Sequence, residues 1–216
     1  MQPWSLVVPA KLLSTAKSRL TPLTSTLPGD RRSGHDLLVL DLLADTLAAA
    51  LASPAVGRLL VVTDEPRAIA LATELGAGTV ADEPGSGLNA ALAHGAAHAR
   101  ADGAGPVAAL ASDLPALQPA ELTAALTAAG GHPRSLVADA AGTGTTLLAV
   151  RDGDLAPRFG PGSAAAHAAG GAVPLDGDWP GLRQDVDTPA DLQTARRIGV
   201  GPRTAGFLSA TRWSSG

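Results

Sequence analysis

Three aspartates in two distant segments carry side chains that could bind a metal ion. Asp113 follows a run of small apolar residues in the sequence ALASDLPAL. Asp185 and Asp187 alternate in the segment QDVDTP, so they share one face if that segment is extended. Carboxylates are typical ligands of Mg²⁺, which is commonly held by one or two of them together with substrate phosphates. Asp113 and one of the pair would then form a magnesium site, while the other of the pair helps to cap or orient the following helix. Alternatively, Asp113 simply caps the next turn.

A basic segment follows the first apolar run of the chain. Within PAKLLSTAKSRL, residues 9–20, three cations occur in a chain that has 16 Lys and Arg in total: Lys11, Lys17 and Arg19. Lysine supplies a point charge and arginine a planar fork for phosphate oxygens. The segment therefore predicts a site for a phosphate-rich ligand, although a solvent-exposed basic loop also explains it. It lacks the G-x-x-x-x-G-K-[ST] pattern of a P-loop.

Two glycine-rich segments could add anion-binding backbone groups. GTGTT at 142–146 and FGPGS at 159–163 could present N–H groups and hydroxyls to a phosphate, although both are also compatible with simple turns. The pair His94 and His98 has helical spacing, but no third ligand lies nearby in the sequence. We interpret that pair as surface or packing residues rather than as a zinc site.

Strands that alternate with helices would bring these segments together. Apolar runs predict strands at 6–9, 58–63, 78–81 and 106–111. Helices are predicted at 40–51, after a polar connection at 21–34, and at 66–75, at 88–101 and from Gln118 onward. This alternation indicates a parallel sheet with right-handed crossovers. Ligands of such sheets bind beyond the carboxyl ends of the strands, which is where the acidic and basic segments would meet.

The pattern changes after residue 134. Strands at 135–139 and 145–150 are joined by the short link AAGTG, which predicts an antiparallel hairpin or an excursion at the sheet edge. A small helix, a short strand near 172–175 and a last helix from Thr188 to near Gly199 follow, the last with Asp191 completing its cap. We expect one domain over residues 1–205 and a C-terminal tail over 206–216 that is frayed at its end.

The composition narrows the class of protein. Of the 216 residues, 45% are hydrophobic but only 2% aromatic, which predicts a core of Leu, Val and Ala. A net charge of −4 argues against a general nucleic-acid or anionic-membrane surface. The lack of cysteine excludes disulfides, thiolate catalysis and Cys-bound zinc. No apolar run reaches the roughly 20 residues of a membrane span, and the start MQPWSLVVPAKLL lacks the order of a signal peptide, so we expect a soluble cytoplasmic protein.

Six motifs in order resemble one known family. They are P-x-K-x-x-x-x-x-K-x-R-L at 9–20, GLNAAL at 87–92, SDLPAL at 112–117, GTGT at 142–145, RFGPGS at 158–163 and DVDTPADL at 185–192. Over roughly residues 4–205 the chain resembles the guanylyltransferases of deazaflavin coenzyme (coenzyme F-420) biosynthesis, which act on 2-phospho-L-lactate in archaea and on phosphoenolpyruvate in actinobacteria. The resemblance implies a Rossmann-like nucleotidyltransferase fold, a mixed and mostly parallel sheet flanked by helices, similar to molybdopterin guanylyltransferases and sugar-nucleotide transferases.

The resemblance also assigns roles to matching positions. It implies that Asp113 and Asp185 bind Mg²⁺ and that Asn89 lies where the guanosine is read. It places the nucleotide phosphates at Lys11, Lys17 and Arg19. It places the phosphate and carboxylate of the acceptor at Thr145, Gly160 and Ser163.

The implied reaction transfers GMP from GTP to the phosphate of a three-carbon acid and releases pyrophosphate. That phosphate is already an anionic nucleophile, so no general base is needed, and charge neutralisation with positioning carries the catalysis. Lys17 and Arg19 would stabilise the departing pyrophosphate. We favour phosphoenolpyruvate, giving enolpyruvoyl-2-diphospho-5′-guanosine, which a deazaflavin transferase would consume. Rival acceptors are 2-phospho-L-lactate and 3-phosphoglycerate, and a rival of another class is a non-catalytic nucleotide-binding protein.

Overall fold

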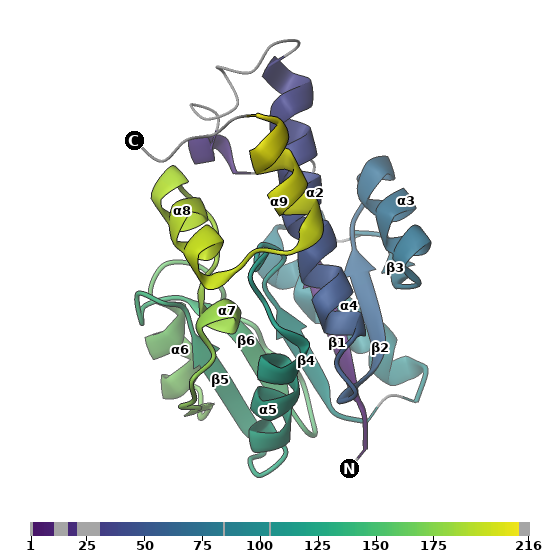
Figure 1. Ribbon diagram of the computed structural model, residues 1–216. Helices are drawn as coiled ribbons and strands as arrows, with labels where there is room; N and C mark the ends of the chain where they lie inside the picture. Colours follow the sequence, from purple (N-terminus) through teal and green to yellow (C-terminus); the bar gives the residue numbers. More distant parts are fainter. Residues whose placement is uncertain (1, 11–16, 21–30, 84, 104, 212–216) are drawn as a thin grey trace.

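A single mixed sheet forms the centre of the molecule (Figure 1). The computed structural model describes residues 2–10, 17–20, 31–83, 85–103 and 105–211, and in these ranges seven strands pair in the order β3-β2-β1-β4-β6-β5-β7. Strands β1 to β4 pair in parallel, whereas β6 runs antiparallel to both β4 and β5. The strands are β1 (Trp4–Pro9), β2 (Val56–Val62), β3 (Gly78–Val80), β4 (Val107–Leu110), β5 (Arg134–Ala138), β6 (Thr145–Val150) and β7 (Val173–Pro174).

Helices cover both faces of this sheet. The contacts place α2, α3, α5 and α7 against one core cluster, and α4 and α6 against the other. The helices are η1 (Ser18–Leu20), α2 (Arg31–Leu51), α3 (Pro66–Leu75), α4 (Leu88–Ala101), α5 (Pro119–Ala129), α6 (Ser163–Ala169), α7 (Pro180–Arg183), α8 (Pro189–Ile198) and α9 (Pro202–Ala210). This two-sided cover is what a mostly parallel sheet requires, because neither of its faces can be left to water.

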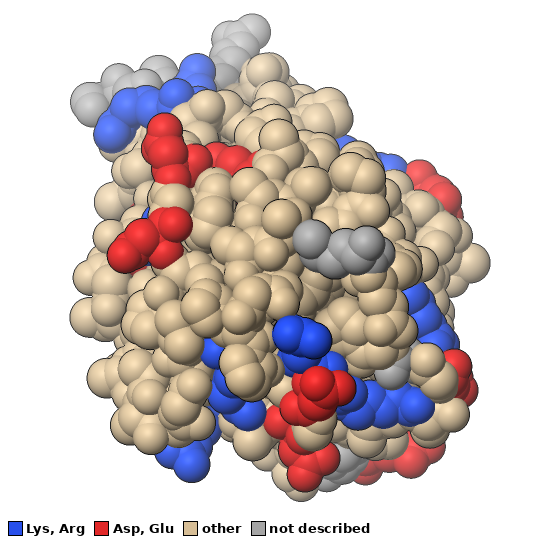
Figure 2. All heavy atoms as spheres, turned by 90° about the horizontal axis from the view of Figure 1, so that it is seen from below, with Lys and Arg blue, Asp and Glu red and all other residues tan. Residues whose placement is uncertain are grey.

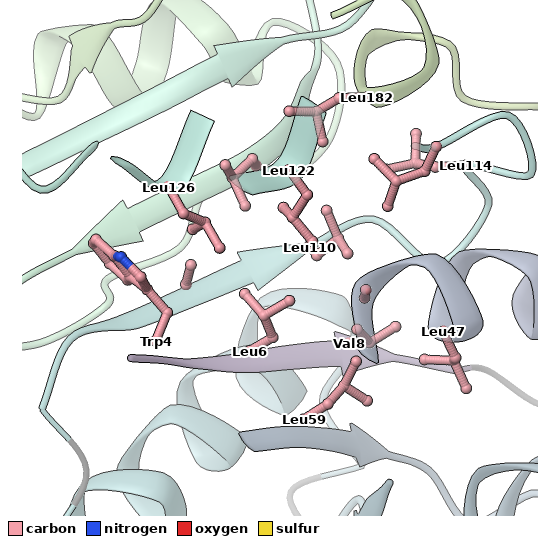
Figure 3. Packing of buried hydrophobic residues seen from close by; sticks show 14 of the residues in the cluster. Trp4, Leu6, Val8, Leu47, Leu59, Leu110, Leu114, Leu122, Leu126 and Leu182 are labelled. Carbon is pink, nitrogen blue, oxygen red and sulfur yellow. The ribbon is translucent and has the colours of Figure 1, made fainter. Parts of the chain in front are cut away.

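The core is built from Leu, Val and Ala, as the composition predicts. Successive residues of a strand point to opposite faces, so Leu6 and Val8 of β1 join one cluster and Val7 joins the other. Figure 3 shows Leu6 and Val8 among the leucines of the first cluster, with Trp4 at the start of the same strand. On the opposite face, α4 packs very closely at Gly95, where an added Cβ would lie 2.5 Å from a methyl group of Val62.

The order and bounds of the predicted elements agree well with the structure. The helices at 66–75 and 88–101 are confirmed with the predicted bounds, and 135–139 and 145–150 form the predicted hairpin as β5 and β6. The hairpin is not an excursion at the edge, because β6 pairs with β4 and lies inside the sheet. Helix α2 begins at Arg31, earlier than the predicted residue 40, so the polar connection is shorter than expected. Residues 21–30 of that connection lie outside the described residues.

Helix α9, which was not expected from the sequence, lies alongside α2 (Figure 1). Asp45 of α2 is 5% exposed, and its carboxylate accepts hydrogen bonds from the backbone N–H groups of Arg203 at 3.1 Å and Thr204 at 2.8 Å. These are N–H groups of the first turn of α9, which have no partner within the helix. The start of α9 is thus stabilised by a residue of another helix, so no local cap marks it in the sequence. Residues 212–216, where fraying is expected, lie outside the described residues.

The surface in the described parts of the chain mixes charges of both signs. On the face shown in Figure 2, basic and acidic side chains lie near one another around a broad uncharged area, without a continuous basic patch. None of the described helices combines the length and the apolar character needed to cross a membrane.

Candidate active site

A cleft of about 710 Å³ lies beyond the carboxyl ends of β1 and β4 and at the start of β6. Most of the predicted site residues line it: Lys17, Arg19, Asp113, Thr145, Gly160, Ser163 and Asp185. Asn89 is not part of its lining, and Lys11 lies outside the described residues. Segments that are far apart in the sequence therefore meet at the sheet edge where the parallel-sheet rule places ligands.

The turn that carries Asp113 is held from three directions. Ala111 N–H donates to the carbonyl of Thr146 at 2.8 Å, which keeps the chain beside β6 just after β4 ends. The buried hydroxyl of Thr46 on α2 accepts from Leu114 N–H at 2.9 Å. Val186 N–H donates to the Asp113 carbonyl at 3.1 Å. This last bond joins the SDLP turn to the QDVDTP segment and so places Asp113 beside Asp185.

The ammonium group of Lys17 lies between two carboxylates. Its Nζ pairs with an oxygen of Asp113 and, at 2.5 Å, with Oδ1 of Asp187. Burial by itself would lower the pKa of Lys17, but the carboxylates of Asp113 and Asp187 outweigh it and raise the pKa above its ordinary value. Lys17 therefore stays charged. Its φ of 53° is in the left-handed region, an uncommon conformation for a non-glycine residue, and it often marks a functional position.

Asp185 is a further, partly buried carboxyl group beside this cluster. Burial, followed by the charges of Asp113 and Asp187, raises the pKa of Asp185 from 3.8 to about 7, although Lys17 opposes the shift. Carboxylate oxygens are the ligands that Mg²⁺ prefers, and a cation here would relieve the crowding of like charges. The donor set thus fits Mg²⁺. No group of three or more His, Asp or Glu side chains positioned to hold a metal ion occurs among the described residues, so water or substrate oxygens would have to complete the coordination.

Neither carboxylate of the QDVDTP segment caps α8. The Thr188 hydroxyl accepts from Asp191 N–H at 3.3 Å, and Asp191 Oδ2 accepts from Thr188 N–H at 2.8 Å. This is the capping box that the sequence predicts for the last helix. The expectation that one of these two aspartates helps to cap this helix is therefore wrong, because Thr188 and Asp191 form the cap. Both aspartates line the cleft instead.

The opposite wall of the cleft carries hydroxyl groups and glycine turns. Ser163 Oγ donates to Thr145 Oγ1 at 3.1 Å, and both residues are buried. Asp139 accepts from Thr143 N–H at 2.9 Å and from Gly144 N–H at 2.8 Å, which fixes the GTGT turn. This turn contacts the start of α6 through a bond from Ala164 N–H to the Thr143 carbonyl. The wall is therefore held rigidly before a ligand arrives.

Asn89 holds this wall from outside the cleft. Its Nδ2 donates to the Phe159 carbonyl at 3.0 Å, and its Oδ1 accepts from Phe159 N–H at 2.7 Å. The amide of Asn89 is thus bonded on both sides to the RFGPGS loop. These bonds connect α4 to the loop that contains Gly160, one residue after Phe159.

Three further residues matter beyond those to which the resemblance assigns a role. Asp187 pairs with Lys17, Asp139 holds the GTGT turn, and His167 contacts Thr145. The alternation of Asp185 and Asp187 in the sequence is a signal for Asp187, but no local pattern marks Asp139 or His167. The interpretation of His98 as a surface residue agrees with its exposed side chain, which lies 3.7 Å from Asp102.

Comparisons with known proteins show similarity to guanylyl transferases over most of the chain. Residues 4–171 match the family model described as "Guanylyl transferase CofC like". The phosphoenolpyruvate guanylyltransferase of Geodermatophilus obscurus is 62% identical over 213 residues, covering 99% of this chain and 97% of its own length. That of Streptomyces coelicolor is 57% identical over 205 residues, covering 94% of each chain.

Solved structures show the same fold at low sequence identity. A nucleotidyl transferase from Methanothermobacter thermautotroptrophicus superposes with a TM-score of 0.62 at 21% identity, covering 97% of this chain and 100% of its own. A 4-diphosphocytidyl-2C-methyl-D-erythritol synthase has a TM-score of 0.62 at 14% identity, covering 92% and 99%. The predicted nucleotidyltransferase fold is confirmed. Because the family model covers most of the chain and the relatives cover nearly all of it, the chain belongs to the CofC-like guanylyl transferase family.

Proposed function

We propose that this protein transfers GMP from GTP to the phosphate of phosphoenolpyruvate, with release of pyrophosphate. The observation that carries the proposal is a single cleft with two unlike walls. One wall gathers Lys17, Asp113 and Asp185, a mixed cation and carboxylate cluster suited to a metal-bound triphosphate. The other offers the hydroxyl groups of Thr145 and Ser163, which suit a small anion. The choice of phosphoenolpyruvate follows the names of the relatives.

In the proposed reaction, an oxygen of the acceptor phosphate attacks the α-phosphorus of GTP while the bond to pyrophosphate breaks. The attacking oxygen carries no proton that must be removed, so the residues of this chain act by positioning and by charge. Lys17, which stays protonated, and the exposed Arg19 would neutralise the triphosphate and the departing pyrophosphate. Thr145, Gly160 and Ser163 hold the acceptor.

Mg²⁺ is part of this proposal. Asp113 and Asp185 would hold it, and Asp187 lines the same wall of the cleft. When bound, the ion supplies positive charge against the phosphate oxygens. Two features support this assignment: carboxylates are the groups that Mg²⁺ prefers, and burial, followed by the charges of Asp113 and Asp187, raises the pKa of Asp185.

The product and the role of Asn89 rest on the family resemblance, and the proposed location rests on the sequence pattern at the start of the chain. The product would be enolpyruvoyl-2-diphospho-5′-guanosine, which a deazaflavin transferase would use in coenzyme F-420 biosynthesis. The reaction would take place in the cytoplasm. Asn89 remains a proposed contact to the guanosine, although its side-chain amide is bonded to Phe159.

A direct assay tests the reaction and its acceptor. Purified protein is incubated with GTP and Mg²⁺, phosphoenolpyruvate, 2-phospho-L-lactate or 3-phosphoglycerate is added, and pyrophosphate release and product mass are measured. We expect turnover with phosphoenolpyruvate. Preference for another of these acids would overturn the acceptor, and no turnover with any of them would leave the non-catalytic nucleotide-binding alternative.

A pair of matched variants tests the carboxylate cluster. Asp113→Asn is expected to abolish turnover, because it removes a charge from the cleft while keeping the shape of the side chain. Asp102→Asn is the control, because Asp102 is an exposed aspartate that pairs with Arg58 and does not line the cleft. Wild-type activity in Asp113→Asn would remove Asp113 from the mechanism.

A further inference from the structure

His167 lies buried behind the wall of the cleft that carries Thr145 and Ser163, the acceptor wall, and both of its ring nitrogens are hydrogen-bonded. It is 1% exposed and belongs to α6. Its Nε2 lies 2.8 Å from the backbone nitrogen of Arg158, and its Nδ1 lies 3.0 Å from Thr145 Oγ1. The ring does not line the cleft, so it cannot act on a ligand directly. It contacts the cleft through the hydroxyl of Thr145.

The contact with Arg158 decides which nitrogen of the ring carries the proton. A backbone N–H can only donate, so Nε2 must accept and carry no hydrogen. A neutral imidazole then has its proton on Nδ1, which donates to Thr145 Oγ1. Burial, together with the nearby charges of Arg134 and Arg158, lowers the pKa of His167 to about 4, which agrees with a neutral ring at physiological pH.

The tautomer of His167 controls which hydrogens the wall can offer to a ligand. With Nδ1 as a donor, Thr145 Oγ1 accepts from the ring, and one bond joins Thr145 to Ser163. The two hydroxyl groups have two protons, and only one is used between them, so the other is left to donate into the cleft. With the opposite tautomer, Thr145 would donate to the ring and Ser163 to Thr145. Only lone pairs would then face an anion.

We propose that His167 is a positioning residue for the acceptor: by donating to Thr145, it frees one hydroxyl proton of the Thr145–Ser163 pair to bind the acceptor phosphate or carboxylate. This inference rests on the proposed function, in which that wall holds the phospho-acid. The backbone of Arg158, in the RFGPGS loop, fixes the tautomer. The loop therefore shapes the wall and also sets the direction of its hydrogen bonds.

Two substitutions separate the two hydrogen bonds of the ring. His167→Gln can place an acceptor near Arg158 N–H but offers no donor at the Nδ1 position, whereas His167→Asn can place an amide N–H there. We expect His167→Gln to raise the KM for phosphoenolpyruvate about tenfold to a hundredfold, as for loss of a hydrogen bond to a charged group. The KM for GTP should change by less than about twofold, and His167→Asn should recover much of the loss. His98→Gln, an exposed site on α4, is the matched control.

Selective ¹⁵N labelling of histidine tests the tautomer without any substrate. The His167 signal, identified by its loss in the variants, should show a protonated Nδ1 and an unprotonated Nε2 at neutral pH. A ring protonated at Nε2 would overturn the proposal. An unchanged KM for phosphoenolpyruvate in His167→Gln would also overturn it. So would a result in which His167→Gln and His167→Asn both raise the KM for phosphoenolpyruvate and the KM for GTP equally and lower the melting temperature, since this would indicate a structural role. Failure of the wild-type protein to turn over would refute the proposed function, while the ring's protonation would still be measured.

Discussion

Asp185 is expected to titrate near neutral pH in the metal-free protein, and this can be measured directly. Burial and the charges of Asp113 and Asp187 raise its pKa from 3.8 to about 7. The shift sets an upper bound of about 4 kcal/mol on the free energy that disfavours the ionised carboxylate in the folded protein, and solvent screening of this partly buried group reduces that figure. Because the folded pKa lies above the unfolded one, the contribution of Asp185 to stability is present at low pH. It is lost as the pH rises from about 4 through about 7.

The same shift predicts that binding of Mg²⁺ releases protons in a pH-dependent amount. A carboxylate must lose its proton to bind the ion, so the number released equals the protonated fraction of Asp185 before binding. With a pKa of about 7, that is about 0.9 proton per ion at pH 6, about half a proton at pH 7 and about 0.1 at pH 8. Substitution of Lys17 by Met should raise the pKa of Asp185 further, because the ammonium group opposes the shift.

Two measurements check this prediction. The ¹³C shift of the Asp185 carboxyl group, followed between about pH 4 and pH 9, gives the pKa in the metal-free protein. Isothermal titration calorimetry with Mg²⁺, repeated in two buffers of different ionisation enthalpy, gives the number of protons released. The reasoning that burial and neighbouring negative charges raise the pKa of Asp185 would be refuted by either of two results. One is that its carboxyl group titrates near its ordinary pKa, and the other is that equal numbers of protons are released at pH 6 and pH 8.

Three further predictions concern residues outside the carboxylate cluster. Asn89→Ala should raise the KM for the phospho-acid about tenfold, because Phe159 loses both of its bonds to α4; an effect on the KM for GTP alone would instead favour the guanosine contact. Asp45→Ala should lower the free energy of unfolding in urea by about 3 kcal/mol, because two N–H groups of α9 lose their acceptor, and wild-type stability would contradict this. Gly95→Ala should lower the melting temperature, with a loss of stability of about 1–3 kcal/mol, because the added methyl group overpacks the contact with β2. Gly206→Ala in α9, where the added methyl group meets open space, should raise stability by about 0.5–1 kcal/mol, and equal shifts of both variants in calorimetry would refute the packing argument.

The sheet and most helices could be predicted because their signals are local. Apolar runs mark β1, β2 and β4, and proline and capping residues mark the starts of α3 and α8. The short link at 140–144 indicated a hairpin because it is too short for a helical crossover. The position of β6 between β4 and β5 could not be predicted, because it depends on pairing with a strand far away in the sequence.

The residues that line the cleft could be predicted better than their contacts. Asp113 and Asp185 were predicted to meet, but the bond between Val186 N–H and the Asp113 carbonyl, which brings them together, has no sequence signature. Lys17 was assigned to phosphates, whereas the structure shows that it also neutralises Asp113 and Asp187. His167 follows a glycine loop and looks like an ordinary helix residue. Its importance depends on a backbone N–H and a hydroxyl group from two other segments.

The bonds between Asp45 and α9 set a sequence of events during protein synthesis. The carboxylate of Asp45 accepts from N–H groups 158 and 159 positions later in the chain. While that part of the chain is still being made on the ribosome, this carboxylate stays hydrated, and the neighbouring Leu38 and Leu42 lack the cover of Leu208. The central sheet can assemble earlier, but α2 completes its packing only after α9 has emerged. A chain that ends before α9 is therefore expected to keep Leu38 and Leu42 less covered than the full chain does.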